Sequence, residues 1–331
     1  MDLSTSLAGV RFPNPVFTAS GCAAAGQELA QFFDVADLGG VVTKSIMLRA
    51  RSGRATPRMA ETPSGMLNSI GLQGPGVESF LHKDLSWLAQ RGARAVVSIA
   101  GGSVEDYAQL ARHLRGRPGL SMVEVNISCP NVEDRGQVFA CDPHASAAVV
   151  AAVRQNTAPG IPVFAKLSPD VTDIVSIARA CVGAGADGLS LINTLLGMVI
   201  DTTTMRPALA GITGGLSGPA IRPVAVRCVW QVAAALPGVP ILGMGGIRTG
   251  LDALEFVLAG ASAVSVGTTV FGDPTAPARI LGELAAALSE RGFDRFSDAV
   301  GLAQRPAQEP AADEPDPYPP PIPVRTPIVF D

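Results

Sequence analysis

Short apolar runs rich in β-branched residues recur along this chain, separated by longer stretches with hydrophobic residues at helical spacing. Near-continuous apolar runs are typical of parallel strands that are covered on both faces. The pattern predicts eight such strands, at residues 16–18, 40–44, 95–99, 122–126, 162–166, 188–193, 240–244 and 263–267. Amphipathic helices are predicted between them, at residues 104–114, 145–155, 174–184, 223–236 and 251–259.

Eight alternating β–α units in about 300 residues fit a single (β/α)8 barrel, the TIM barrel of the α/β class. A doubly wound sheet is the alternative, but it requires a glycine-rich turn after the first strand. The chain has no such turn at that place. We therefore expect residues 1–303 to form one barrel domain.

The composition changes after residue 303. Residues 304–331 contain nine of the 27 prolines together with five acidic residues, without helical or strand periodicity. Such a segment is prone to polyproline conformation, and we expect a disordered acidic extension. Its apolar end, Ile328–Phe330, leaves docking against the barrel or a partner open.

Charge and cysteine usage exclude several classes of function. The net charge is −4 and the basic residues are scattered, so no footprint for nucleic acid is present. No signal peptide is visible, and the uncharged Cys228–Ile247 window contains prolines and glycines that would break a membrane-spanning helix. The five cysteines form no CxxC pair, so neither a disulfide scaffold nor a metal site is expected. These features favour a cytoplasmic protein.

Polar residues follow the predicted strands at the end where a TIM barrel carries its chemistry. They are Ser20 and Gly21, Lys44, Asn126 and Cys129, Lys166, Asn193 and Thr194, Gly245 and Gly246, and Gly267 and Thr268. A buried lysine is costly unless it is paired or functional, so Lys44 and Lys166 at one mouth indicate a binding site. Structural ion pairing is the alternative for either lysine alone.

The loops after the last two predicted strands indicate a phosphate site. Gly243–Ile247 and Val266–Thr269 contain glycines that allow backbone N–H groups to approach an anion. Tight turns alone would also explain single glycines. A phosphorylated ligand is predicted, without a distinction between FMN and a sugar phosphate.

Cys129 is the candidate for acid–base chemistry, because it lies just after a predicted strand between Asn126 and Asn131. The segment Val132–Phe139 is a candidate lid over the site. Cysteines on helical faces are expected to pack as small hydrophobic residues, and packing is favoured for the other two as well; these four are Cys181, Cys228, Cys22 and Cys141.

Asn68 adds another amide in a loop rich in small and apolar residues. Asparagine amides pair with ring N–H and C=O groups, and a lysine such as Lys44 neutralises a carboxylate. Each asparagine alone is more often a turn residue. Together, these side chains match a planar ligand that bears imide and carboxylate groups.

Several ordered motifs resemble those of the class 1 dihydroorotate dehydrogenases, over roughly residues 3–303. The motifs are Ala19–Gly21, Val42–Ser45, Met66–Gln73, Asn126–Val132, Ala165–Pro169, Asn193–Met198, Thr213–Ala220, Gly245–Ile247 and Val266–Thr268. The resemblance implies a flavoprotein that uses FMN to oxidise (S)-dihydroorotate to orotate in de novo pyrimidine (UMP) biosynthesis. Class 2 enzymes use serine as the base, whereas this chain has Cys129.

The resemblance also implies residue roles. Cys129 as thiolate would remove the proton at C5 of dihydroorotate, while hydride leaves C6 for N5 of FMN. The substrate would be held by Lys44, Asn68, Asn126, Asn131, Asn193 and Thr194. The flavin would be contacted by Ser20, Gly21, Lys44, Ser45, Asn126, Lys166 and Gly218, and its phosphate by Gly245, Gly246, Gly267 and Thr268.

The motifs around Cys129 and the Thr213–Ala220 run resemble subclass 1B. Enzymes of that subclass are built on a homodimer and pair with a subunit that carries FAD and a 2Fe–2S cluster and passes electrons to NAD. Two departures from the family pattern are Gly74, where asparagine is usual, and Ala23–Ala25, where an aromatic, glycine-rich segment is usual. The proline-rich tail also lies outside the family pattern.

Other functions remain open at this point. A fumarate-linked class 1A enzyme shares most of the motifs, and a reductase like dihydropyrimidine dehydrogenase is disfavoured by Lys44. A Schiff-base aldolase could use Lys166 or Lys44 on the same barrel. A non-catalytic FMN-bearing scaffold is disfavoured by the intact Cys129.

Overall fold

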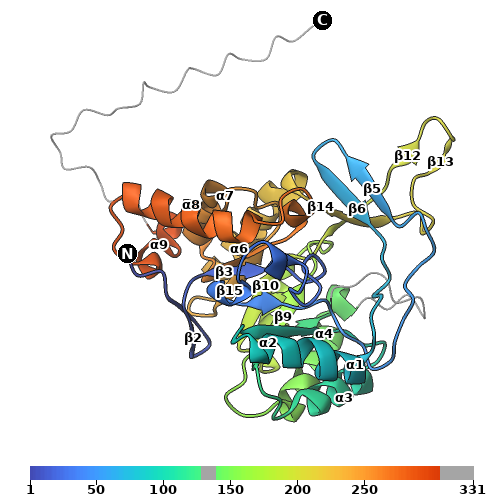
Figure 1. The fold of residues 1–331 in the computed structure, drawn as a ribbon, viewed down its shortest axis with the longest axis horizontal. Helices are drawn as coiled ribbons and strands as arrows, with labels where there is room; N and C mark the ends of the chain where they lie inside the picture. The colour runs from blue at the N-terminus through green and yellow to red at the C-terminus, as the bar shows by residue number, and fades with distance from the viewer. Residues whose placement is uncertain (128–138, 306–331) are drawn as a thin grey trace, which may run out of the picture.

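Eight parallel strands form a barrel in the computed structural model, which describes residues 1–127 and 139–305 (Figure 1). The strands are β3 (Val16–Thr18), β4 (Val41–Val42), β7 (Ala95–Ile99), β8 (Leu120–Asn126), β9 (Val163–Leu167), β10 (Gly188–Leu191), β15 (Ile241–Met244) and β16 (Ala263–Val266). They follow the order β3-β16-β15-β10-β9-β8-β7-β4, and a parallel bridge between Phe17 and Gly40 joins the two ends. The predicted (β/α)8 fold is confirmed.

Helices cover the outside of the barrel, and consecutive helices pack against one another (Figure 1). They are α1 (Val77–Phe80) and α2 (Ser86–Gln90), joined through the turn Leu81–Leu85, then α3 (Val104–Leu114), α4 (Pro143–Asn156), α5 (Ile174–Gly183), α6 (Arg222–Ala235), α7 (Gly250–Ala259), α8 (Ala276–Glu290) and α9 (Phe296–Ala299). Side-chain caps fix the first turns of several helices. The Ser103 hydroxyl accepts from the Asp106 N–H at the start of α3, and Thr249 forms a capping box with Asp252 at the start of α7. All five predicted helices are confirmed, and residues 77–90 and 276–290 add helical stretches outside the predicted set.

The barrel interior is apolar at the amino-terminal end of the strands and polar at the carboxyl end. The apolar layer is formed by Val42, Val96, Met122, Phe164, Leu242 and Ala263. Two residues further along the same strands, and therefore on the same face, come Ser98, Glu124, Lys166, Met244 and Ser265. All of these side chains are buried. The polar layer lies directly below the end where the predicted site residues follow the strands.

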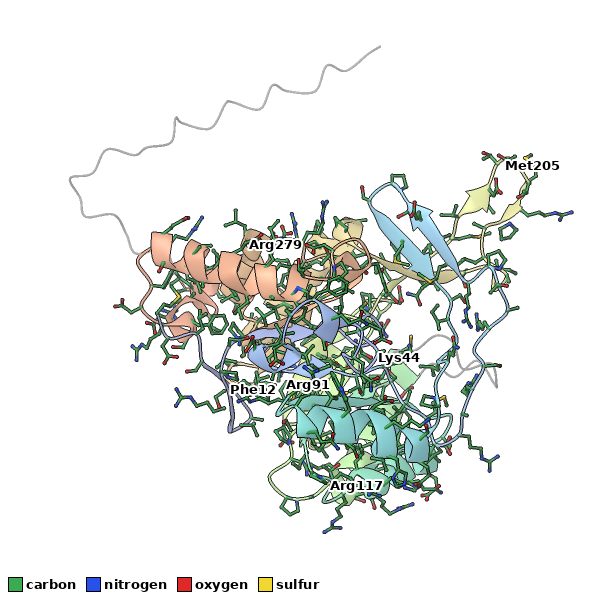
Figure 2. The ribbon with its side chains drawn as sticks, viewed as in Figure 1. Phe12, Lys44, Arg91, Arg117, Met205 and Arg279 are labelled. Carbon is green, nitrogen blue, oxygen red and sulfur yellow. The ribbon has the colours of Figure 1, made fainter. Side chains whose placement is uncertain are left out.

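A short antiparallel hairpin closes the apolar end of the barrel. Its strands are β1 (Thr5–Leu7) and β2 (Val10–Phe12), and Leu7 and Phe12 are fully buried in the cluster that fills the barrel. The Phe12 ring meets Phe17 edge-on, with ring centroids 5.0 Å apart. Figure 2 shows Phe12 on the side of this hairpin and Lys44 toward the opposite end. The hairpin therefore covers the apolar end of the barrel interior.

A four-stranded antiparallel sheet lies over the polar end of the barrel. It has the order β11-β14-β6-β5 and is built from β5 (Met59–Thr62), β6 (Gly65–Asn68), β11 (Leu195–Gly197) and β14 (Gly214–Ser217). A hairpin of β12 (Ile200–Asp201) and β13 (Arg206–Pro207) projects beside it (Figure 1). These strands come from the loops after β4 and β10, and they were not among the predicted elements.

Short 3-10 turns occur at Leu29–Gln31, Val35–Asp37, Phe139–Cys141, Pro219–Ile221, Thr268–Phe271 and Leu302–Gln304. Gln304 donates hydrogen bonds to the carbonyls of Ala259 and Trp230, which ties the end of the described chain to the barrel. The predicted tail lies outside the described residues from residue 306 onward, as does the predicted lid up to residue 138. Across residues 1–127 and 139–305, we find no helix with the length and apolar character needed to span a bilayer.

Candidate active site

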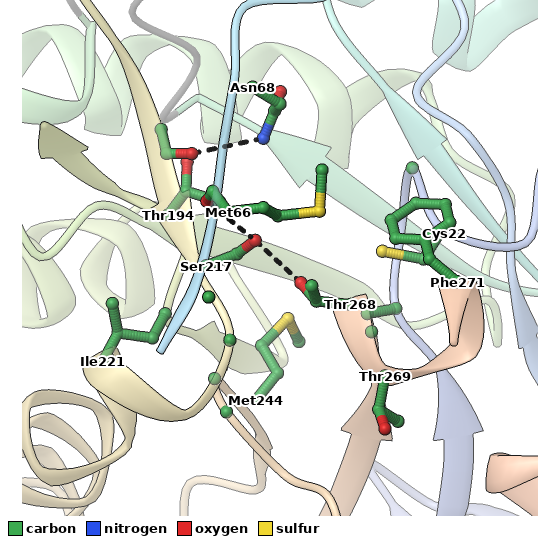
Figure 3. Close-up of a pocket in the computed structure, with 18 of the residues that line it drawn as sticks. Cys22, Met66, Asn68, Thr194, Ser217, Ile221, Met244, Thr268, Thr269 and Phe271 are labelled. Carbon is green, nitrogen blue, oxygen red and sulfur yellow. Dashed lines mark hydrogen bonds between the residues drawn. The ribbon is translucent and has the colours of Figure 1, made fainter. Parts of the chain in front are cut away.

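A cavity of about 920 Å³ lies between the carboxyl ends of the barrel strands and the antiparallel sheet (Figure 3). This volume is within the usual range for cofactor and small-ligand sites. Every predicted site residue that the structure describes lines it, from Ser20 after β3 to Thr268 after β16. Cys129 and Asn131 lie outside the described residues, so their placement stays a prediction. The rule that the carboxyl ends of barrel strands converge on one site was thus sufficient to predict most of the residues that line this cavity.

A chain of hydrogen bonds fixes the amide of Asn126 at the cavity wall. Asn126 Nδ2 donates to Ser45 Oγ at 2.9 Å, and Ser45 Oγ lies 2.9 Å from Ser98 Oγ and 3.4 Å from Ser20 Oγ. The Tyr107 hydroxyl donates to the Asn126 carbonyl at 2.8 Å. Since Asn126 and Ser45 are buried, this network holds their side chains in one orientation.

Two lysines supply positive charge at the cavity. Lys166 is 5% exposed and its Nζ lies 3.6 Å from Oε1 of the fully buried Glu124. Lys44 reaches the segment after β3, where its Nζ is 3.6 Å from the point that a Cβ on Gly21 would occupy. A side chain at position 21, whose φ is +89°, would be strained and would contact Lys44.

Cys22 also lines the cavity, although packing was favoured for it from the sequence. Burial raises the pKa of the Cys22 thiol to about 11, while the ammonium groups of Lys166 and Lys44 lower it. The thiol is therefore neutral near pH 7 and is not prepared to act as a base. The packing expectation is confirmed for Cys181 and Cys228, which are buried, and is wrong for Cys141, which is exposed.

Glycines bring three backbone segments together on the side of the cavity next to β15 and β16. Gly218, Gly245 and Gly246 have φ values of +97°, +132° and +80°. A Cβ on Gly246 would lie 2.7 Å from the Gly218 carbonyl oxygen, so only glycine allows this approach. Across the same region, Thr268 Oγ1 donates to Ser217 Oγ at 2.7 Å (Figure 3). These features make a backbone-lined cradle of the kind that receives a phosphate.

Amides from the covering sheet face the cavity from the other side. Asn68 Nδ2 donates to the Gly215 carbonyl at 3.4 Å (Figure 3). The Asn193 carboxamide oxygen accepts from the Thr194 N–H at 2.8 Å, which orients that amide. A Cβ on Gly215 would lie 2.0 Å from Thr194 Oγ1, so the close packing of β14 on this loop requires glycine. The cavity therefore offers amide donors and acceptors opposite its cationic wall.

Sequence reasoning missed Glu124 and Ser217, which reach or support the cavity. Glu124 occurs within an otherwise apolar strand, two residues before Asn126, and this period of two was the available signal. Ser217 joins the site through the pairing of β14 with β6. That pairing links residues about 150 positions apart, 68 with 215 for example, and no local pattern indicates it.

The two departures from the family pattern have different structural settings. Gly74 forms an isolated bridge with Arg51. A Cβ at this position would meet no neighbouring atom within 4 Å. In the alanine segment, Ala23 and Ala25 are buried, and the Ala24 carbonyl accepts from the Lys44 N–H at 2.8 Å. This segment is thus part of the packing that supports Lys44.

Comparison with known proteins agrees with this geometry. The family model described as dihydroorotate dehydrogenase matches residues 2–288. The catalytic subunit of dihydroorotate dehydrogenase B (NAD(+)) from Desulforudis audaxviator is 51% identical over 302 residues, which cover 91% of this chain and 97% of that protein. The protein of the same name from Pelobacter propionicus is 51% identical over 300 residues, which cover 91% and 98%. Its counterpart from Geobacter sp. strain M21 is 48% identical over 300 residues, which cover 91% and 97%.

Proposed function

The chain belongs to the dihydroorotate dehydrogenase family, and we propose that it oxidises (S)-dihydroorotate to orotate in de novo pyrimidine biosynthesis. The observation that carries this proposal is the gathering of every described candidate residue around one cavity of suitable size. The names of the relatives, which cover nearly the whole barrel, support the choice of substrate.

FMN is the proposed cofactor, because the cavity has a volume typical of cofactor sites and a glycine-lined cradle suited to a phosphate. The glycine-lined segments at Gly245, Gly246 and Gly267, with Thr268, receive the phosphate. The flavin ring would be contacted by residues that line the same cavity, namely Ser20, Gly21, Ser45, Asn126, Lys44, Lys166 and Gly218. Bound FMN supplies the hydride acceptor, and the Lys166 charge favours the more negative reduced flavin.

The chain's own polar groups bind and orient the substrate. Lys44 neutralises the carboxylate, and amides complement the ring N–H and C=O groups. The amide set consists of Asn68, Asn126, Asn131 and Asn193, with the Thr194 hydroxyl beside it. The hydrogen bonds already made by Asn126 and Asn193 hold these groups in place before the substrate arrives. The cover of the antiparallel sheet limits the access of water to this end of the barrel.

Cys129 is the proposed base that takes the proton from C5 of the substrate. Removing a proton beside a carbonyl creates enolate character, which the surrounding amide donors stabilise. Replacing Cys129 with alanine should leave FMN bound and slow flavin reduction by about two to four orders of magnitude. Cys141→Ala is the matched control, because that thiol is exposed and lies outside the cavity lining. Flavin reduction by Cys129→Ala at the wild-type rate would remove Cys129 from the mechanism.

The proposed electron acceptor is NAD, reached through a partner subunit that carries FAD and a 2Fe–2S cluster. The words "NAD(+)" and "catalytic subunit" in the names of the relatives support this arrangement. The test is an assay of the purified chain with dihydroorotate and NAD, fumarate or a quinone, with and without the co-expressed partner. NAD reduction that requires the partner supports the proposal, and fumarate reduction by the chain alone would contradict it.

A further inference from the structure

Glu124 is a buried carboxylate to which the proposed reaction assigns no role. It lies on β8, in register with Ser98 of β7 and Phe164 of β9, and its side chain is fully buried. It belongs to the same inward-facing row as Met122 and Asn126. The strand thus places a carboxyl group inside the barrel, directly below the cavity.

The contacts of Glu124 are unusual for a buried charge. Within the described part of the chain, neither carboxylate oxygen has a hydrogen-bond partner. Oε1 lies 3.6 Å from Lys166 Nζ, which is longer than a direct hydrogen bond. The interaction between the two groups is therefore mainly Coulombic. Lys166 is in turn a lining residue of the cavity, so the pair connects the barrel interior to the site.

Stability does not account for this arrangement. Taking a carboxylate out of water is costly, and replacing a buried ion pair with apolar residues is often neutral or stabilising. Glu124 also lacks the additional hydrogen bonds that would offset its burial. Departures from packing rules of this kind concentrate at functional sites.

We propose that Glu124 is a positioning residue, which acts through Lys166 by offsetting its charge at the cavity and so lowers the midpoint potential of bound FMN. This inference rests on the proposed function. A flavin gains negative charge on reduction, which a lone ammonium group favours and a neighbouring carboxylate opposes. Among the described residues, the Cys22 thiol also lies near enough to feel this charge, since the ammonium groups of Lys166 and Lys44 both lower its pKa. A lowered potential suits onward transfer to NAD, the acceptor in the names of the relatives.

The test is the midpoint potential of the FMN-loaded chain, measured by equilibration with reference dyes for wild type, Glu124→Gln and Glu124→Asp. Glutamine keeps the shape and removes the charge, so the potential should rise, and aspartate keeps the charge and should stay close to wild type. The thermal unfolding midpoint of Glu124→Gln should be no lower than that of wild type. A potential in Glu124→Gln that is unchanged or lower would overturn the inference.

The matched control is Glu290→Gln, which makes the same charge change at the end of α8 on a side chain that is 75% exposed. Because water and salt screen a charge at that site, the midpoint potential of FMN in Glu290→Gln should equal that of wild type. If Glu124→Gln yields no folded flavoprotein, the comparison is made with Glu124→Met, which also removes the carboxylate and suits the apolar surroundings of this buried side chain. Its potential should be higher than that of wild type, and an equal or lower potential would overturn the inference.

Failure of this inference is distinguishable from failure of the proposed function, since the potential is measured without dihydroorotate. A purified chain that binds no FMN contradicts the proposed function. A chain that binds FMN and shows no shift in Glu124→Gln contradicts only the role of Glu124.

Discussion

The side chains at the carboxyl end of the barrel differ in how firmly the structure fixes their chemistry. Asn126 is held by a network of buried hydroxyl groups, whereas Cys22 lies among lysines but remains a neutral thiol. The two cysteines of the site are therefore expected to behave differently. Cys129 is the proposed base, and the environment of Cys22 disfavours a thiolate.

The reactivity of Cys22 tests this environment. Its pKa of about 11 predicts that iodoacetamide modifies it slowly near pH 7 and faster as the pH rises toward 11, because only the thiolate reacts. Peptide mass spectrometry of the flavin-free protein measures the rate. Cys141 is the internal control, because its thiol is exposed and should be modified faster than Cys22 near pH 7, even though partial burial and Asp170 also raise the Cys141 pKa. Equal rates at the two cysteines near neutral pH would contradict the assigned environment.

At the scale of elements, the barrel strands were predictable and the covering sheet was not. A strand such as β7 (Ala95–Ile99) is buried on both faces and appears in the sequence as a continuous apolar run. By contrast, β6 begins at Gly65 and β14 at Gly214, and their pairing depends on contacts between distant parts of the chain. The site residues could be predicted where they follow barrel strands, and Ser217 could not because it depends on this sheet.

The loop after β15 allows a direct test of the glycine cradle. Gly246→Ala combines positive φ with a Cβ only 2.7 Å from the Gly218 carbonyl oxygen, whereas Gly238→Ala has positive φ and nothing within 4 Å. Both should lose about 1 kcal/mol from backbone strain. Gly246→Ala alone should also lose at least about tenfold in FMN affinity, which corresponds to about 1.4 kcal/mol. Fluorescence titration with FMN and urea unfolding measure the two effects, and equal FMN affinities would contradict the proposed cradle.

At the scale of the whole molecule, the barrel separates stability from chemistry along its axis. One end is closed by the β1–β2 hairpin and filled with apolar side chains, and the other carries the cavity. Changes at the closed end should therefore affect unfolding and leave ligand binding intact. This division follows from the alternation of side chains along each strand, since residues two positions apart share the interior.

Phe12→Ala tests this separation. Phe12 is fully buried against Phe17, so the variant should lose about 3 to 5 kcal/mol in the free energy of unfolding. Its affinity for FMN should remain that of wild type. Phe32→Ala is the matched control, because that side chain is 56% exposed and its loss should cost far less. Urea denaturation measures the free energy of unfolding of both variants. An equal loss in the two would contradict the role of the β1–β2 hairpin in closing the apolar end of the barrel.

We propose that this barrel binds FMN and uses it to oxidise dihydroorotate. The most direct measurement mixes the purified, FMN-loaded chain with dihydroorotate in the absence of oxygen and follows the visible absorbance of the flavin. We predict that the oxidised flavin spectrum bleaches and that one orotate forms for each flavin reduced. A chain that purifies without flavin and binds none when it is added, or a bound flavin that dihydroorotate leaves oxidised, would contradict the account.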